Sequence, residues 1–333
     1  MFMLTGLLGA MLAGVAIVGL VADFDSTDDD MLDEDPTDEG SDDTVVDIGT
    51  FFGVEAAPAE AEAIDAPNDG ESDTILAGTE VSDVLTGGTG DDQIGGYGGE
   101  DSVLGGDGSD DLHGAEGNDL ILGNDGDDVV HGEAGDDQLF GGAGDDQLYG
   151  HEGDDSLDGE SGDDSLVGGG GNDALIGGSG SDALHGGLND DSLTGGTGAD
   201  TLFGGWGNDD INGNDDTDAD FLNGGGGDDT INAGSADIVS LGDGSDTVLI
   251  GEWIEDPVTV TDFDMGEDIM LLIYDDSNGI DPVLELEPSQ TTPGDMVLTM
   301  NGEAIATLNN VTTVNDANFV LMPQSSLESL SAA

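Results

Sequence analysis

Lysine and arginine are absent from this chain of 333 residues, whereas aspartate and glutamate together number 78. The formal net charge at pH 7 is −78, and repulsion between these like charges opposes compaction of the chain. Nucleic acid is excluded as a partner, because binding phosphate requires Lys and Arg. No carboxylate can be neutralised by a Lys or Arg of the same chain, so dissolved cations must take that role.

Cysteine is also absent, and aromatic residues make up only 4% of the chain. The lack of cysteine excludes disulfides, thiol catalysis and zinc–thiolate sites. With so few aromatics and 60 glycines, the chain cannot assemble a large conventional core. Any crosslinking of the fold must therefore come from metal ions.

In place of these residues the chain has a nine-residue repeat, which runs for fourteen uninterrupted units from Gly87 to Asn212. Position one is Gly, position six is Asp and position eight is Ile, Val or Leu in all fourteen units. Position four is Gly in thirteen of them, the exception being Asn189. A merely solvated acidic surface gives no reason to place Asp at one phase of a short period. The repeat predicts an all-β fold built as a stacked coil.

Within each unit, positions seven to nine are expected to form a short strand whose position-eight side chain points opposite to its neighbours. Positions one to six are expected to form a turn, in which Gly at positions one and four permits a positive φ and close backbone approach. If successive strands alternate between two sheets, unit n stacks on unit n+2. Two nine-residue units, or eighteen residues, then make one coil.

These turns collect the oxygen ligands that calcium prefers, since the position-six carboxylate lies beside carbonyls that glycine leaves unshielded. Calcium takes six to eight oxygens at about 2.3–2.6 Å. One turn cannot supply that many, but two stacked turns can, and a strand spacing of roughly 4.8 Å suits a shared ion. We therefore expect calcium between the turns of units n and n+2.

The units GGDGSDDLH (Gly105–His113), GGAGDDQLY (Gly141–Tyr149) and GGTGADTLF (Gly195–Phe203) resemble the hemolysin-type calcium-binding repeat of the RTX family, G-G-x-G-x-D-x-U-x. The resemblance covers about half of the chain and implies a parallel β-roll of the serralysin type, a β-solenoid with Ca²⁺ in its turns, on proteins that act outside the cell. It implies carboxylate ligands at Asp92, Asp101, Asp110, Asp119, Asp128, Asp137, Asp146, Asp155, Asp164, Asp173, Asp182, Asp191, Asp200, Asp209, Asp220, Asp229, Asp237 and Asp246. It also implies backbone oxygen ligands at Gly90, Gly108, Gly117, Gly126, Gly135, Gly144, Gly153, Gly162, Gly171, Gly180, Gly198 and Gly207.

Several units depart from the pattern. Asn189 replaces the position-four Gly, and Tyr97, Glu133, His151 and Glu160 each replace the second Gly of their units. After Asn212 the period slips, so sites there are expected to be the first to stay empty. Fourteen regular and four later units give eighteen, and stacking n on n+2 leaves at most sixteen ions (18 − 2).

The repeat divides the chain into four parts: a hydrophobic segment at residues 1–22, an acidic tether at 23–72, the β-roll at 73–250 and a β module at 251–333. The first segment is long enough as a helix to cross roughly 30 Å of hydrocarbon. It has no Lys or Arg at its start and a poor cleavage site, which favours an uncleaved anchor over a cleaved signal peptide. The acidic flank then places the N-terminus inside and the repeats outside.

Two further segments have a pattern of their own. VVDIGTFFGV (Val45–Val54) is the one apolar patch of the tether, and it is either a local strand or a docking site. From Gly251 glycine becomes sparse, and VTVTDF (Val258–Phe263) and DIMLLIY (Asp268–Tyr274) indicate ordinary antiparallel strands, as do three later segments. Asn301-Gly302 is expected to form a hairpin turn. Such a module would cap the open end of the solenoid.

No catalytic signature is present. A zinc protease requires H-E-x-x-H on a helix, and the closest string, HEGDD (His151–Asp155), lacks the second His. Paired carboxylates such as Asp136-Asp137 recur turn after turn, which marks them as metal ligands and solvated neighbours. The C-terminal module contains no His at all. We therefore expect no enzyme.

The outer faces of the coil carry two patterns. His113, His131 and His185 occupy position nine and point outward. His113 and His131 are on adjacent coils, where the pair could hold a transition metal or sense pH, although a solvated sheet face is the simpler interpretation. On the other face Leu104, Leu122 and Phe140 follow one another on consecutive coils, as a stripe for a partner or a second roll.

The sequence thus predicts a calcium-binding repeat protein at the cell surface or in the extracellular space, whose β-roll folds on binding Ca²⁺. The expected role is structural or adhesive, with cell-surface or matrix partners and with membrane contact only through the N-terminal helix. The alternative is a freely secreted protein that leaves by a type I-like route. A third interpretation is a secreted enzyme whose activity lies in the C-terminal module.

Overall fold

The computed structural model describes residues 62–65, 73–214, 216–251, 254–277, 279–311 and 316–326. The hydrophobic segment at 1–22 and the apolar patch Val45–Val54 lie outside these residues. Within them, no helix is both long enough and apolar enough to span a membrane. The division of the chain into four parts stays a prediction.

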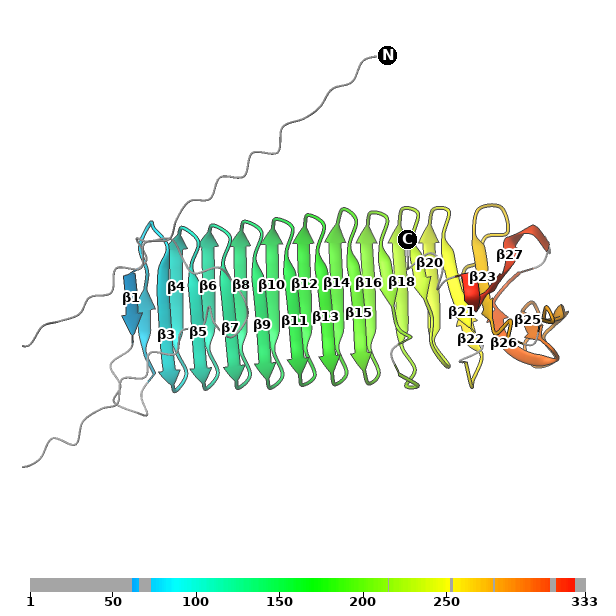
Figure 1. Cartoon of the computed structure of the whole chain (residues 1–333), viewed down its shortest axis with the longest axis horizontal. Coiled ribbons are helices and arrows are strands. Elements are labelled where there is room, and N and C mark those ends of the chain that lie inside the picture. Colours follow the sequence, from blue (N-terminus) through cyan, green and yellow to red (C-terminus); the bar gives the residue numbers. More distant parts are fainter. Residues whose placement is uncertain are drawn as a thin grey trace, which may run out of the picture.

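The described chain winds into an elongated parallel β-solenoid (Figure 1). Odd-numbered strands up to β23, followed by β27, make one sheet of 13 strands. Even-numbered strands up to β22, followed by β26, β25 and β24, make a second sheet of 14 strands. In the regular region each residue pairs with the residue eighteen positions later, as Leu139 does with Leu157. The expectation that unit n stacks on unit n+2 is confirmed.

The 13-stranded sheet consists of β1 (Glu62–Asp65), β3 (Asp83–Thr89), β5 (Ser102–Asp107), β7 (Leu120–Asp125), β9 (Gln138–Ala143), β11 (Ser156–Ser161), β13 (Ala174–Ser179), β15 (Ser192–Thr197), β17 (Asp210–Asn212), β19 (Thr230–Asn232), β21 (Thr247–Gly251), β23 (Ile269–Tyr274) and β27 (Phe319–Pro323). A short 3₁₀ helix, η1 (Asp316–Asn318), precedes β27.

The 14-stranded sheet consists of β2 (Ile75–Ala77), β4 (Gln93–Gly98), β6 (Asp111–Glu116), β8 (Val129–Ala134), β10 (Gln147–Glu152), β12 (Ser165–Gly170), β14 (Ala183–Leu188), β16 (Thr201–Trp206), β18 (Phe221–Gly226), β20 (Ile238–Asp243), β22 (Val258–Val260), β24 (Leu284–Pro288), β25 (Met296–Met300) and β26 (Glu303–Leu308).

The strands are longer than the sequence predicts. A typical strand such as β10 has six residues and runs from position seven of one unit to position three of the next, which leaves positions four to six for the turn. The expectation of a three-residue strand and a six-residue turn is therefore wrong. The cause is that coil-to-coil pairing continues past the position-one glycine, as the pairing of His151 with Gly169 shows.

Glycine serves different purposes at different positions of the repeat. Positive φ angles occur at position four, as in Gly144 (144°), and at position two, as in Gly142 (116°) and His151 (79°). Position one does not have a positive φ, so that part of the prediction is wrong. Glycine is needed there because of close approach: a Cβ on Gly87 would lie 2.6 Å from the carbonyl oxygen of Gly105 and closer still to Asp92 Oδ2.

The core is a narrow column of position-eight side chains. Leu112, Leu139, Leu166 and their equivalents in every regular unit have at most 1% of their surface exposed. Burying one such side chain contributes about 1.5–3 kcal/mol, and each coil adds two. This stacked column replaces the aromatic core that the chain lacks.

The C-terminal region continues the solenoid. Strand β22 pairs in parallel with β20 and β26, and β23 pairs in parallel with β21 and β27. Antiparallel pairing is found only between β24 and β25 and between β25 and β26 among the described strands. The expectation of antiparallel strands is thus wrong for β22 and β23, because apolar alternation looks the same in both kinds of pairing. The hairpin turn at Asn301 (φ 56°) and Gly302 (φ 86°) is confirmed.

Candidate metal centre

Two ladders of aspartate side chains run along the turns of the solenoid. In each ladder the backbone N–H of one Asp donates to Oδ1 of the corresponding Asp one coil further on, at 2.7–3.1 Å. One ladder comprises Asp83, Asp101, Asp119, Asp137, Asp155, Asp173, Asp191, Asp209, Asp229, Asp246 and Asp268. The other comprises Asp92, Asp110, Asp128, Asp146, Asp164, Asp182, Asp200, Asp220 and Asp237.

The structure thus brings all eighteen predicted aspartates into two continuous rows, in which each has at most 4% of its surface exposed. Sequence reasoning missed the two ends of one row, Asp83 and Asp268, as ligand candidates. The sequence could have indicated both. An apolar residue follows each of them two positions later, Leu85 and Met270, just as position eight follows position six. Gly99 also occupies position four, and its positive φ of 116° lies within the range of the predicted glycines, from 111° at Gly90 to 147° at Gly207.

The two oxygens of each carboxylate have different surroundings. Whereas Oδ1 accepts the ladder hydrogen bond, Oδ2 is buried and has no hydrogen-bond partner among the described residues in Asp92, Asp101, Asp110, Asp119, Asp128, Asp137, Asp146, Asp155, Asp164, Asp173, Asp182, Asp191, Asp209, Asp229 and Asp246. An orphaned buried polar atom costs about 1–3 kcal/mol, and more when it is charged. Repeating this cost in coil after coil requires a compensating cation.

Backbone oxygens lie close to these orphaned atoms. Beside the Cα of Gly87 are both Asp92 Oδ2 and the carbonyl oxygen of Gly105, one coil further on. The same pair recurs around Gly123, where a Cβ would lie 2.5 Å from the carbonyl oxygen of Gly141. A carboxylate and a carbonyl thus face the same space in successive turns, and a side chain at position one would fill it.

Burial also raises the pKa of many ladder carboxyls, from Asp101 to Asp268, above the ordinary value of 3.8. The pKa rises to about 6 for Asp101, about 7 for Asp119 and about 8 for Asp220. Desolvation is the largest cause, and carboxylates in the neighbouring coils raise the pKa further, whereas the ladder N–H lowers it. Without a cation, these carboxyls of the folded ladder therefore bind protons more tightly than ordinary carboxyls do.

The irregular units keep the ladder but alter it. The offset between rungs is 20 residues from Asp200 to Asp220 and 17 from Asp220 to Asp237, so the slips after Asn212 are absorbed in the connections. Asp237 Oδ2 accepts the N–H of Gly234 at 2.6 Å and is not orphaned. Asn189 keeps a positive φ of 77° at position four. Calcium-poor sites at these places stay a prediction.

The donor set fits calcium. Every candidate ligand in the turns is a carboxylate or carbonyl oxygen, the donor type that a hard divalent cation prefers. The orphaned Oδ2 atoms supply negative charge where no Lys or Arg exists to balance it. When bound, calcium would supply charge neutralisation and links between coils.

No curated protein sequence matches the chain. Among solved structures, the extracellular lipase LipA from Serratia marcescens matches over 75% of this chain at 16% identity and a TM-score of 0.15. The chain spans 40% of the length of that lipase.

The family model of the RTX calcium-binding nonapeptide repeat (4 copies) matches residues 77–112, 104–139, 113–148, 149–184, 185–219 and 216–248. Together these matches cover residues 77–248, more than half of the 333 residues. RTX nonapeptide repeats bind calcium, and the ladder of buried aspartates fits that activity. The chain belongs to the RTX family of calcium-binding nonapeptide repeat proteins.

Proposed function

We propose that this protein is a structural calcium-binding module that works outside the producing cell, where calcium loading completes its fold. The observation that carries the proposal is the pair of aspartate ladders with orphaned Oδ2 atoms in a chain without Lys or Arg. Extracellular calcium modules bind with dissociation constants of about 10⁻⁴–10⁻³ M. With dissociation constants in this range, the roll would be folded outside the cell and expanded inside it.

The ligands in this proposal are the position-six aspartates, Asp92 through Asp246, with backbone oxygens of the glycine turns. Each ladder carboxylate whose Oδ2 is orphaned keeps its Oδ1 hydrogen bond and offers Oδ2 to the ion. Because the carboxylate must be deprotonated to bind, calcium competes with the protons that the raised pKa values favour. Binding energy thereby becomes folding energy, and several ions act together along one roll.

The role we propose is structural or adhesive rather than catalytic. The ladders use their carboxylates as repeated, equivalent groups, unlike a catalytic centre, in which the environments of two groups differ. The proposed location is the cell surface, with the N-terminal segment as an anchor, or the medium, after export by a type I-like route. The two differ in where the protein is recovered: an anchored protein keeps Met1 and stays with the cells, whereas an exported protein is found in the medium.

An external-protease experiment on intact producing cells tests this function. With calcium in the medium, the roll should be outside the cytoplasm and resist the added protease. After a calcium chelator is added, the same protease should degrade it, and mass spectrometry of the intact protein should give its N-terminus. A roll that is cut only after the cells are lysed would contradict the extracellular role. Equal cleavage with and without chelator would contradict calcium-dependent folding.

A further inference from the structure

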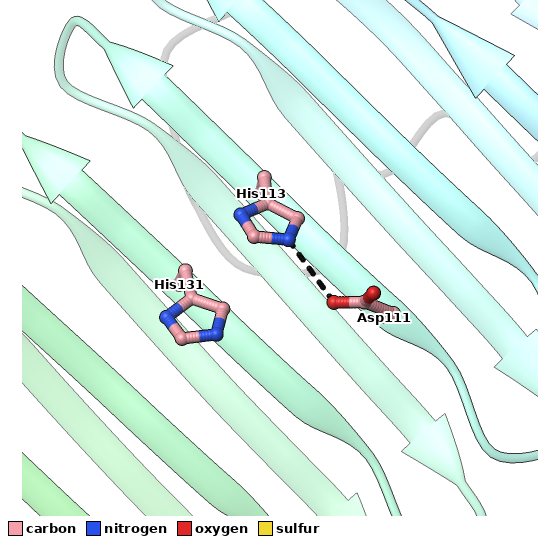
Figure 2. A group of neighbouring side chains, drawn as sticks. All are labelled: Asp111, His113 and His131. Carbon is pink, nitrogen blue, oxygen red and sulfur yellow. Dashed lines mark hydrogen bonds and ion pairs between the residues drawn. The ribbon is translucent and has the colours of Figure 1, made fainter.

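A second group of potential metal ligands lies on the outer face of the 14-stranded sheet, away from the turns. His113 on β6 pairs in register with His131 on β8, and His131 pairs with Tyr149 on β10. Glu133 and His151, at position two of their units, pair with each other across β8 and β10. We call Asp111, His113, His131, Glu133 and His151 the histidine cluster. Figure 2 shows three of its members, with His113 and His131 on adjacent strands.

The contacts within the histidine cluster are close and polar. His113 Nε2 lies 3.0 Å from Asp111 Oδ1, and His113 Nδ1 lies 3.0 Å from Glu133 Oε1. His131 Nδ1 lies 3.0 Å from His151 Nε2. The rings of His113 and His131 stack with centroids 4.7 Å apart and an interplanar angle of 13°. Stacking and hydrogen bonds thus hold three imidazoles and two carboxylates together.

We propose that the histidine cluster binds one first-row transition-metal ion, with Zn²⁺ as the reference ion, at Asp111, His113 and His131. One ligand atom from each of these residues lies within 4.8 Å of the other two. In a tetrahedral zinc site with bonds of 2.0–2.1 Å, ligand atoms are about 3.3 Å apart. The pair from Asp111 and His113 is already at 3.0 Å. The His131 ring, which is nearly parallel to that of His113, must turn toward this pair to complete the set.

The donor types distinguish this site from the calcium turns. Imidazole nitrogen suits zinc, copper and nickel, whereas calcium takes oxygen ligands. The ladder aspartates are buried in the turns, whereas the side chains of Asp111, His113 and Glu133 are 45%, 35% and 46% exposed. An ion from solvent can therefore reach the histidine cluster without entering a calcium site.

The neighbours of the three ligands match the outer partners of known metal sites. A metal-bound His usually donates its other N–H to a carboxylate, and Glu133 is placed to accept from His113 Nδ1. Asp111 Oδ2 accepts a hydrogen bond from Gln93 Nε2 at 2.9 Å, which orients the carboxylate. Nε2 of His151 is hydrogen-bonded to Nδ1 of His131, which leaves Nε2 of His131 for the ion.

The charge state of His131 supports this arrangement. Partial burial lowers the pKa of His131, and the neighbouring His113 and His151 lower it further, against the opposing effect of Asp111 and Glu133. Neutral imidazole is the form that binds metal.

Titration of the calcium-saturated full chain with Zn²⁺ by calorimetry, and with Co²⁺ by absorption spectroscopy, tests the proposal. We expect one tight zinc ion per chain and a cobalt spectrum with the ligand-field bands of a nitrogen-containing tetrahedral site. His113→Ala and His131→Ala should each weaken zinc binding by at least about 100-fold, and Glu133→Gln by roughly 10–100-fold. Circular dichroism in calcium checks that each variant keeps its β fold.

His185→Ala is the matched control, since His185 also occupies position nine of the same sheet but packs edge-on against Phe203 instead. It should bind zinc like the unaltered chain. Three results would overturn the proposal. The first is zinc binding no tighter than that of the surface carboxylates, and the second is a zinc affinity of His131→Ala equal to that of the unaltered chain. The third is zinc uptake that is matched by release of calcium.

Discussion

At the scale of the residue, the position-six aspartate combines two functions in one side chain. Its Oδ1 stabilises the stack by accepting the N–H of the preceding rung, as Asp146 does from Asp128. In Asp128, Asp146 and most other rungs, Oδ2 is buried and lacks a hydrogen-bond partner within the described part of the chain. The first function needs only an oxygen, whereas the second needs a negative charge. Substitution by asparagine separates them, because the amide keeps an acceptor oxygen and loses the charge.

The triple variant Asp128→Asn, Asp146→Asn and Asp164→Asn tests this separation against Asp127→Asn, Asp145→Asn and Asp163→Asn. Each triple removes three charges from three consecutive coils, but the first set is buried and the second is exposed. The buried triple should bind fewer calcium ions and need more calcium to fold, because it lacks the orphaned carboxylate oxygens. The exposed triple should behave like the unaltered chain in equilibrium dialysis. Equal calcium binding by both triples would contradict the assignment.

The raised pKa values predict how the metal-free chain responds to pH. The pKa in the folded state is about 6 for Asp137 and about 7 for Asp191, against the ordinary 3.8. The folded state therefore binds protons more tightly than the unfolded state. Stability from these groups is fully present below about pH 4 and is lost as pH rises through about 6 to 7.

Without calcium, the β signal in circular dichroism should thus be strong near pH 4 and weak at pH 8, where added calcium restores it. Ladder carboxylates that titrate at their ordinary values would give a calcium-free signal independent of pH between 5 and 8. That outcome would refute the burial argument.

At the scale of the element, the repeat is a strand of six residues and a turn of three, and close backbone contact between coils fixes its glycines. The sequence predicted the two alternating sheets, the eighteen-residue coil and the inward position-eight residue, because a strict period fixes all three. It did not predict the length of the strands, since glycine at positions one and two suggests a turn. The parallel pairing of β22 and β23 could not be recognised either. It depends on the course of the chain from one coil to the next, which the local alternation of apolar residues does not give.

Like the fold, the candidate site could be predicted only in part from the sequence. The strict period identified fourteen of the aspartates and its slipped continuation four more, whereas the end members Asp83 and Asp268 belong to degenerate units. His113 and His131 were predicted to be neighbours because both occupy position nine, which their stacking confirms. Glu133 and His151 join them from position two, and that contact depends on side-chain directions that the period does not give.

Adjacent glycines offer a test of coil packing. A Cβ on Gly96 would lie 2.7 Å from the carbonyl oxygen of Gly114 and closer to Asp101 Oδ2, whereas a Cβ on Gly95 would meet only Tyr97, at 3.9 Å. Gly96→Ala should destabilise the calcium-loaded roll by about 1–3 kcal/mol, as overpacking does, and Gly95→Ala should change it little. Thermal unfolding in calcium measures both. A similar loss in the two variants would show that position one is glycine for another reason.

At the scale of the whole molecule, charge dominates. Sixteen calcium ions, the maximum predicted for eighteen units, would supply 32 positive charges (16 × 2) against a formal charge of −78. Loading would therefore leave a strongly acidic surface, which keeps rolls soluble and apart. The narrow aliphatic core and the hydrogen-bonded ladders give the fold its form, but the cations allow the carboxylates to come together at neutral pH.

The most direct test of this account is a calcium titration of the full chain at neutral pH, followed by circular dichroism and by equilibrium dialysis in parallel. The account predicts a disordered spectrum without calcium and a cooperative change to a β spectrum at about millimolar calcium, with many ions bound per chain. Magnesium, which demands shorter bonds and dehydrates reluctantly, should not replace calcium. A chain that has the same β spectrum with and without calcium at neutral pH, or that folds while binding no calcium, would contradict it.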